Sequence, residues 1–146
     1  MTHRVKILFE YGGNSPSTVE IESMWAIPVD GGFKLDNIPF FVQGLALDDV
    51  VSAERDSTGM LRFTSVVSYG RHSTVRLWFA KEHEGQVSRV RQRLRELGCP
   101  SELSDLPRLV AVDIPPGVPY VNVQVVLDKY ERDGVFEYEE ACLADN

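Results

Sequence analysis

The stretch PYVNVQVVLDKYER, residues 119–132, decides how the second half of the chain folds, because its apolar residues fit two secondary structures. Its valines alternate with other residues as in a strand, while its two tyrosines and two apolar residues between them are spaced as on one face of a helix. We predict a helix, since Pro119 suits a first turn and the stretch is about 14 residues long. The following pair, Asp133 and Gly134, is typical of a helix end.

The segments around this helix give an order of elements that belongs to a known plan. A second helix is predicted over residues 84–97, and strands over residues 74–80, 109–114 and 136–143. If residues 102–104 form a further short strand, the order is β-α-β-β-α-β. That is the ferredoxin-like plan, in which two helices cover one face of a four-stranded antiparallel sheet. We therefore expect an α+β fold with a ferredoxin-like subdomain over residues 71–146.

The first half of the chain shows short strands of period two and no helical segment. Strands are predicted over residues 5–11, 19–27, 33–35, 50–53 and 60–67, with tight turns at residues 30–32 and 56–59. In the second of these strands Ile21 and Trp25 share one face, and Glu20 and Glu22 share the other. We expect residues 1–70 to form a small antiparallel sheet or a barrel. No linker separates the halves, so they are expected to share an interface.

Composition excludes several classes of protein. The chain has 146 residues and a net charge of −7, whereas a duplex-DNA binder is normally basic. Its two cysteines, Cys99 and Cys142, cannot form a disulfide scaffold or a four-thiolate zinc site. Neither a secretion signal nor an apolar run of membrane-spanning length is present. We therefore expect a cytoplasmic protein with reduced thiols and no membrane partner.

Several short stretches occur together in an order that resembles a known family. The most distinctive is LDNIPFF at residues 35–41, and weaker landmarks are VKILF at residues 5–9, GRHST at residues 70–74 and YEEACL at residues 138–143. Over residues 4–143 the chain resembles the bacterial domain of unknown function DUF4265. The resemblance implies a small bacterial cytoplasmic protein, but it implies no activity and no catalytic residues.

The polar cluster at residues 70–74 is the best candidate for chemistry. Arg71, His72 and Ser73 together can hold an anion or act as acid and base on a phosphodiester, since histidine titrates near neutral pH. The alternative is a polar connector between the halves, in which Ser73 satisfies local main-chain groups.

Two other places are candidates for binding. Asp36 and Asn37 can line a pocket or serve a turn, and of the neighbouring Phe40 and Phe41 one can belong to an exposed patch or to the interface between the halves. Trp25, Phe40 and Trp78 are candidates for lining a ligand pocket between the halves.

Acidic residues gather at the end of the chain. Residues 128–145 hold seven acids, Glu139 and Glu140 among them, against Lys129 and Arg132, for a net charge of −5. This segment can be a docking face for a basic protein partner or a face that keeps the protein soluble.

Three functions of different classes follow. The first is a non-enzymatic binding or inhibitor protein, of the immunity type, with an acidic and aromatic surface. The second is an enzyme acting on a phosphodiester or nucleotide, with Arg71 and His72 in the cleft between the halves. The third is a small-molecule-sensing domain. The spacing of histidines and cysteines predicts no metal site, and no motif for a cofactor is present.

Overall fold

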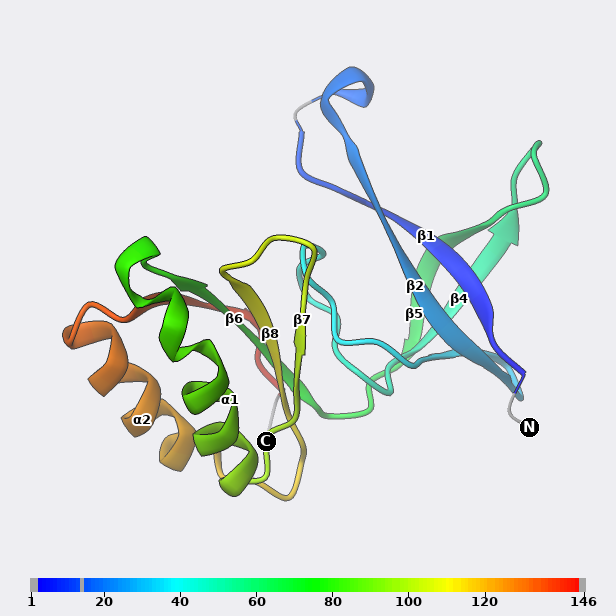
Figure 1. The fold of residues 1–146 in the computed structure, drawn as a ribbon. Coiled ribbons are helices and arrows are strands. Elements are labelled where there is room, and N and C mark those ends of the chain that lie inside the picture. The colour runs from blue at the N-terminus through cyan, green and yellow to red at the C-terminus, as the bar shows by residue number, and fades with distance from the viewer. Residues whose placement is uncertain (1–2, 14, 145–146) are drawn as a thin grey trace.

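The computed structural model describes residues 3–13 and 15–144, which form two α-helices, nine strands and two short 3-10 helices (Figure 1). The strands are β1 Val5–Tyr11, β2 Glu20–Val29, β3 Gly32–Leu35, β4 Val50–Arg55, β5 Leu61–Ser68, β6 Ser73–Phe79, β7 Ser101–Leu103, β8 Leu109–Ile114 and β9 Phe136–Cys142. The helices are α1 Val87–Glu96 and α2 Tyr120–Arg132, and the 3-10 helices are Pro16–Thr18 and Lys81–Gln86. The predicted α+β class is confirmed. Over the described part of the chain, neither α-helix combines the length and the apolar character that crossing a membrane requires.

The first five strands form a closed barrel. Each strand pairs antiparallel with the next along the chain, and β1 closes the barrel through a parallel pairing with β5. Alternate side chains fill the interior, among them Ile7, Phe9, Met24 and Leu35. The β2–β3 hairpin turns through Gly31 at a φ of 89°, a conformation that tight hairpin turns need and that glycine adopts without cost. Of the two alternatives left open by the sequence, the structure contains the barrel.

The inward face of β2 differs from the one that the sequence favours. Its apolar residues Ile21 and Trp25 are 45% and 37% exposed, whereas Glu22, Met24 and Ala26 are buried. The period of two is correct and the choice of face is wrong. The physical reason is that Glu22 replaces its hydration with hydrogen bonds from main-chain N–H groups, so that a carboxylate can lie on the buried face.

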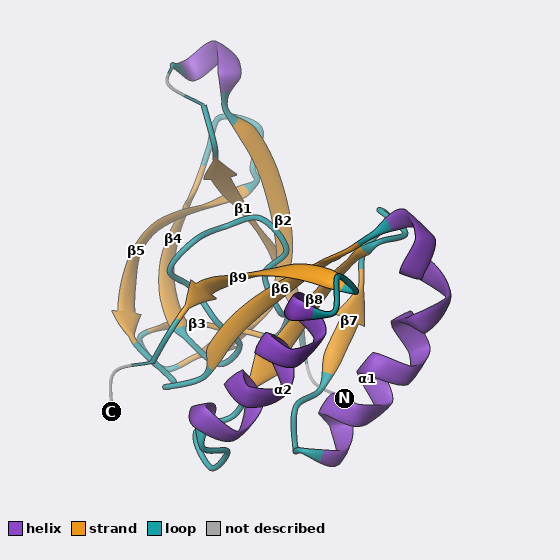
Figure 2. Cartoon of the chain, turned by 90° about the vertical axis from the view of Figure 1, so that its left-hand side faces the viewer, coloured by secondary structure: helices purple, strands orange, loops and turns teal. Residues whose placement is uncertain are grey.

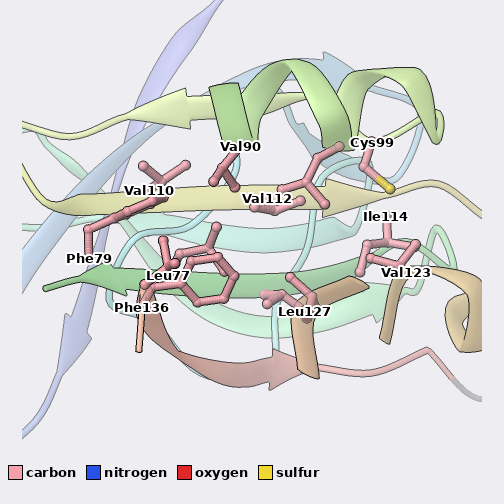
Figure 3. Close-up of a cluster of buried hydrophobic side chains, with 13 residues drawn as sticks. Leu77, Phe79, Val90, Cys99, Val110, Val112, Ile114, Val123, Leu127 and Phe136 are labelled. Carbon is pink, nitrogen blue, oxygen red and sulfur yellow. The ribbon is translucent and has the colours of Figure 1, made fainter. Parts of the chain in front are cut away.

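The second half follows the order β6-α1-β7-β8-α2-β9, and its sheet has the order β7-β8-β6-β9 with every neighbouring pair antiparallel. Both helices lie on one face of this sheet and enclose an apolar core (Figure 3). Leu127 of α2 is fully buried while Val121 and Val125 are exposed, so the valine-rich stretch is a helix, as predicted. Helix α1 begins later than predicted, at Val87, because the preceding residues form the tighter 3-10 turns.

The loop between β3 and β4, residues 36–49, lies between the barrel and the face of the second sheet that carries no helix (Figure 2). From that face the Thr74 hydroxyl of β6 donates to the carbonyl of Leu45 at 3.1 Å. The N–H of Gly44 donates to the carbonyl of Ala141 in β9 at 2.9 Å. The loop belongs to the first half of the chain, yet it packs against the face of the second sheet that carries no helix.

Candidate functional site

Two buried charges hold the loop between β3 and β4 by its main chain. The carboxylate of Glu22 accepts hydrogen bonds from the N–H groups of residues 40–42 at 2.7–3.1 Å. The guanidinium of Arg76 donates to the carbonyls of residues 39, 41 and 42 in the same loop, most closely to that of Val42 at 3.0 Å. Glu22 belongs to the barrel and Arg76 to the second sheet. The two side chains therefore join the halves through the backbone that lies between them.

Glu139 of β9 completes this arrangement. Its Oε1 accepts a hydrogen bond from Nη2 of Arg76 at 2.7 Å and another from the side-chain amide of Gln43 at 2.7 Å. Burial acts to raise the pKa of Glu139, but the hydrogen bonds from Arg76 and Gln43 outweigh it, so the pKa lies below its ordinary value. A residue expected on a docking face thus closes the junction between the halves.

Several of the predicted binding residues support the loop itself. The side-chain oxygen of Asn37 accepts the N–H of Trp25 at 2.6 Å, which prolongs the contact between β2 and the chain after β3. Asp36 forms an exposed ion pair with Arg4 at 3.2 Å. Phe41 stacks on a tyrosine of β1 with ring centroids 5.1 Å apart. These contacts are those of a well-anchored connector.

The pocket expected from Trp25, Phe40 and Trp78 does not come together around those three side chains. Phe40 and Phe41, which lie outside any strand, border a cavity of about 240 Å³ beside β7. Trp78 borders a different cavity beside the end of α2, and Trp25 lies on the outside of the barrel beneath Arg4. A cavity between the halves exists elsewhere, around His72.

His72 lies between two carboxylates. Its Nδ1 donates to Oδ1 of Asp113 at 2.8 Å, and its Nε2 lies 3.3 Å from Oδ2 of Asp48. The side chain of Asp113 is 2% exposed and that of Asp48 is 44% exposed. Burial raises the pKa of Asp113, and the hydrogen bond from His72 opposes that rise. The ring is thereby fixed in orientation by a buried group on one side and a solvated group on the other.

The main chain near His72 is strained. Within the described ranges, Asp48 and Arg71 are the only non-glycine residues with positive φ, at 70° and 68°. Aspartate tolerates this left-handed region better than arginine does. Between them Gly70 approaches Asp48 so closely that a Cβ would lie 2.7 Å from its carbonyl oxygen. Strained backbone of this kind is found most often at functional sites.

Asp49 anchors this strained region. Its side chain accepts the N–H of Gly70 and the N–H of Ala46, both at 2.9 Å. Burial raises the pKa of Asp49, and these two hydrogen bonds oppose the rise. The carboxylate therefore ties the end of the loop to the chain that enters β6.

A cavity of about 800 Å³, the junction cavity, opens at this place between the two halves. Its lining comprises Gly44, Asp49, Ser68, Tyr69, Arg71, His72 and residues 140–144. Arg71 and His72, predicted to lie in a cleft between the halves, both belong to this lining. Ser73 does not: it is buried at the start of β6, and its hydroxyl accepts the N–H of Ala144 at 3.0 Å. The described residues include no group of three or more histidine, cysteine or acidic side chains placed to hold a metal ion.

Most of the acids at the end of the chain are used within the fold. The carboxylates of Asp128 and Glu140 accept hydrogen bonds from tyrosine hydroxyls, and Glu131 accepts the N–H of Tyr138. Asp133 pairs with a lysine one turn earlier in α2, and Asp145 lies outside the described residues. Docking of a basic partner on this segment stays a prediction, since most of its described acids are exposed although they also make contacts within the fold.

The sequence alone missed Glu22, Arg76 and Asp113. A signal for two of them was present, because Arg76 and Asp113 are each the one charged residue of a buried strand. A single charge in a buried strand must have a partner, so it marks a contact between layers.

The family model described as "Domain of unknown function (DUF4265)" matches residues 22–138. Among solved structures, a hypothetical protein from Neisseria gonorrhoeae is similar, with a TM-score of 0.77 and 23% sequence identity. The alignment covers 100% of this chain and 99% of that one, and at this identity it shows the fold alone. No curated protein sequence matches the chain.

Proposed function

Because the chain belongs to the DUF4265 family, a domain family of unknown function, its activity has to be inferred from its own site, and we propose that it is a small-molecule-binding domain whose ligand occupies the junction cavity. The observation that carries the proposal is this cavity of about 800 Å³, lined by both halves. Its volume falls within the range of about 300–1,000 Å³ that is usual for ligand sites.

The walls of the cavity support binding because they are held in place before a ligand arrives. His72 is fixed by two carboxylates and Asp49 by two N–H groups. A preformed site loses little conformational entropy on binding, which favours affinity. Arg71 also lies at the edge of the cavity, and its main chain adopts the left-handed conformation, which is unfavourable for an arginine.

The basic side chain of Arg71 in the lining supports an anionic group on the ligand. Of the acids in the lining, Asp49 already accepts two main-chain N–H groups and Glu140 accepts the hydroxyl of Tyr120. Arg71 is exposed and presents a planar guanidinium, which suits bidentate recognition of a carboxylate or phosphate.

The test is a thermal-shift screen of small carboxylates and phosphate esters. Compounds that bind the folded state raise the melting temperature of the wild-type protein. We expect Arg71→Asn to abolish these shifts without loss of fold, because asparagine tolerates the left-handed region. Arg89→Asn, an exposed arginine on α1, is the matched control and keeps them. The proposal is wrong if no compound shifts the wild type, or if Arg71→Asn responds as Arg89→Asn does.

One observation favours an enzyme as the second candidate. A buried carboxylate on Nδ1 of His72 is the arrangement that orients a general base, and His72 borders the same cavity as Arg71. Asp48 must then leave Nε2 before the ring can act. Hydrolysis of bis(4-nitrophenyl) phosphate by the wild type, lost in a folded His72→Ala variant, supports this candidate. Ligand binding without turnover supports the binding domain.

In the same proposal the second half is a ferredoxin-like unit. Its β-α-β-β-α-β order and its all-antiparallel sheet, with the first strand of the unit next to the third and the fourth, support this assignment. The barrel and this unit then supply opposite walls of one binding site.

A further inference from the structure

A second, smaller cavity of about 270 Å³ adjoins the junction cavity. The two cavities share Arg71, Leu143 and Ala144, so they lie on either side of the same short segment and the same guanidinium. At about 30 Å³ for each water, the smaller cavity has room for about nine water molecules. It therefore suits a short acyl chain or a single ring.

The lining of the smaller cavity is mainly apolar. It comes from the end of β8 and the turn into α2, where Ile114, Pro115, Pro116 and Val118 provide aliphatic surface. Both side-chain hydroxyls in this lining are already engaged. The hydroxyl of Ser73 accepts a main-chain N–H, and the hydroxyl of Tyr120 donates to Glu140.

The smaller cavity is also rigid. Three prolines border it, and each fixes its own φ. The turn between β8 and α2 is closed by a hydrogen bond from the N–H of Val118 to the carbonyl of Pro115 at 3.0 Å. A rigid apolar wall next to a cation is suited to a ligand that has one charged end and one apolar end.

We propose that the ligand of this protein is an amphipathic anion, with its carboxylate or phosphate against Arg71 in the junction cavity and a short apolar group in the smaller cavity. This inference rests on the proposed function and adds the chemical class of the ligand. Leu143, which is 47% exposed and borders both cavities, is the residue over which such a ligand passes.

The experiment uses straight-chain carboxylates from acetate to octanoate, titrated into the full chain and followed by amide chemical shifts in NMR. Each buried methylene should tighten binding about fourfold until the apolar cavity is filled, after which the gain stops. The alkylammonium ions of equal length serve as probes of the wrong charge and should bind at least tenfold more weakly.

Two variants separate the parts of the site. Arg71→Asn should weaken every carboxylate by a similar factor and keep the dependence on chain length. Leu143→Ala should flatten that dependence while acetate binds as before, and Leu106→Ala, a leucine of similar exposure beside another cavity, is its control.

The outcomes distinguish the two proposals. If carboxylates bind in an Arg71-dependent way but with no gain from chain length, the amphipathic class is wrong and the proposed binding function stands. If the gain is the same in Leu143→Ala as in Leu106→Ala, the apolar group binds elsewhere and the inference is overturned. If no member of the series binds and the thermal-shift screen is also negative, the proposed function itself fails.

Discussion

Replacing Arg76 with methionine tests whether the main-chain contacts of the loop hold the two halves together. The guanidinium is 4% exposed, and its loss leaves three carbonyls facing an apolar side chain. When both partners of a buried ion pair are made apolar, stability can be preserved. Here most of the partners are backbone carbonyls, which no substitution can remove.

The magnitude follows from the hydrogen bonds. An unsatisfied buried carbonyl costs about 1–3 kcal/mol, and the bond to Val42, at 3.0 Å, is the strongest of the three. The other two are 3.3 and 3.4 Å long and contribute less. Glu139 is 46% exposed and regains water when Arg76 is lost, so it adds little. We expect the free energy of unfolding to fall by about 3 kcal/mol.

Urea denaturation followed by circular dichroism measures this loss. For a chain of this size a denaturant slope of about 2 kcal/mol/M converts it into a midpoint lower by about 1.5 M. Arg4→Met is the matched control, because Arg4 pairs with another residue of the loop, Asp36, at the surface. An exposed pair is worth about 0–1 kcal/mol, so its midpoint should fall by no more than about 0.5 M. Equal midpoints for the two variants would refute the reasoning.

Three further predictions concern other parts of the molecule. At pH 8 iodoacetamide should modify Cys142, which borders the junction cavity, and spare Cys99, whose pKa burial raises to about 11; peptide mass spectrometry showing equal labelling contradicts this. Leu127→Ala should cost about 2–5 kcal/mol in thermal denaturation, and a loss below about 1 kcal/mol would mean that α2 contributes little to the core. Gly70→Ala places a Cβ 2.7 Å from a main-chain oxygen of the loop and should destabilise by about 1–3 kcal/mol, whereas Gly85→Ala, with open space around it, should not.

Much of the fold could be predicted because its signals are local. Period two marked the barrel strands, and the helix over residues 119–132 followed from its length and from Pro119 at its start. The face of β2 could not be predicted in this way. Trp25 is the more apolar residue, but Glu22 is the one that finds three N–H donors, and those donors come from a loop 18 to 20 residues later.

The site shows the same limit more strongly. Arg71 and His72 stood out as a polar cluster in the sequence. Their surroundings, however, depend on Asp48 and Asp113, which are distant along the chain both from this cluster and from each other. No spacing rule joins residues 48, 72 and 113. Only the packing of the loop against β6 and β8 brings them together.

The position of the loop between the halves also affects the order in which contacts can form during translation. The barrel strands precede the second half in the chain, but the loop at residues 36–49 needs Arg76 from β6 and Ala141 from β9. At about 5–20 residues per second, the stretch between the end of the barrel and β9 takes about 3 to 13 s to translate. During that interval the N–H of Gly44 lacks its acceptor on Ala141, and Arg76 lacks its partner Glu139. The loop between the halves is therefore fully paired only once β9 has been made.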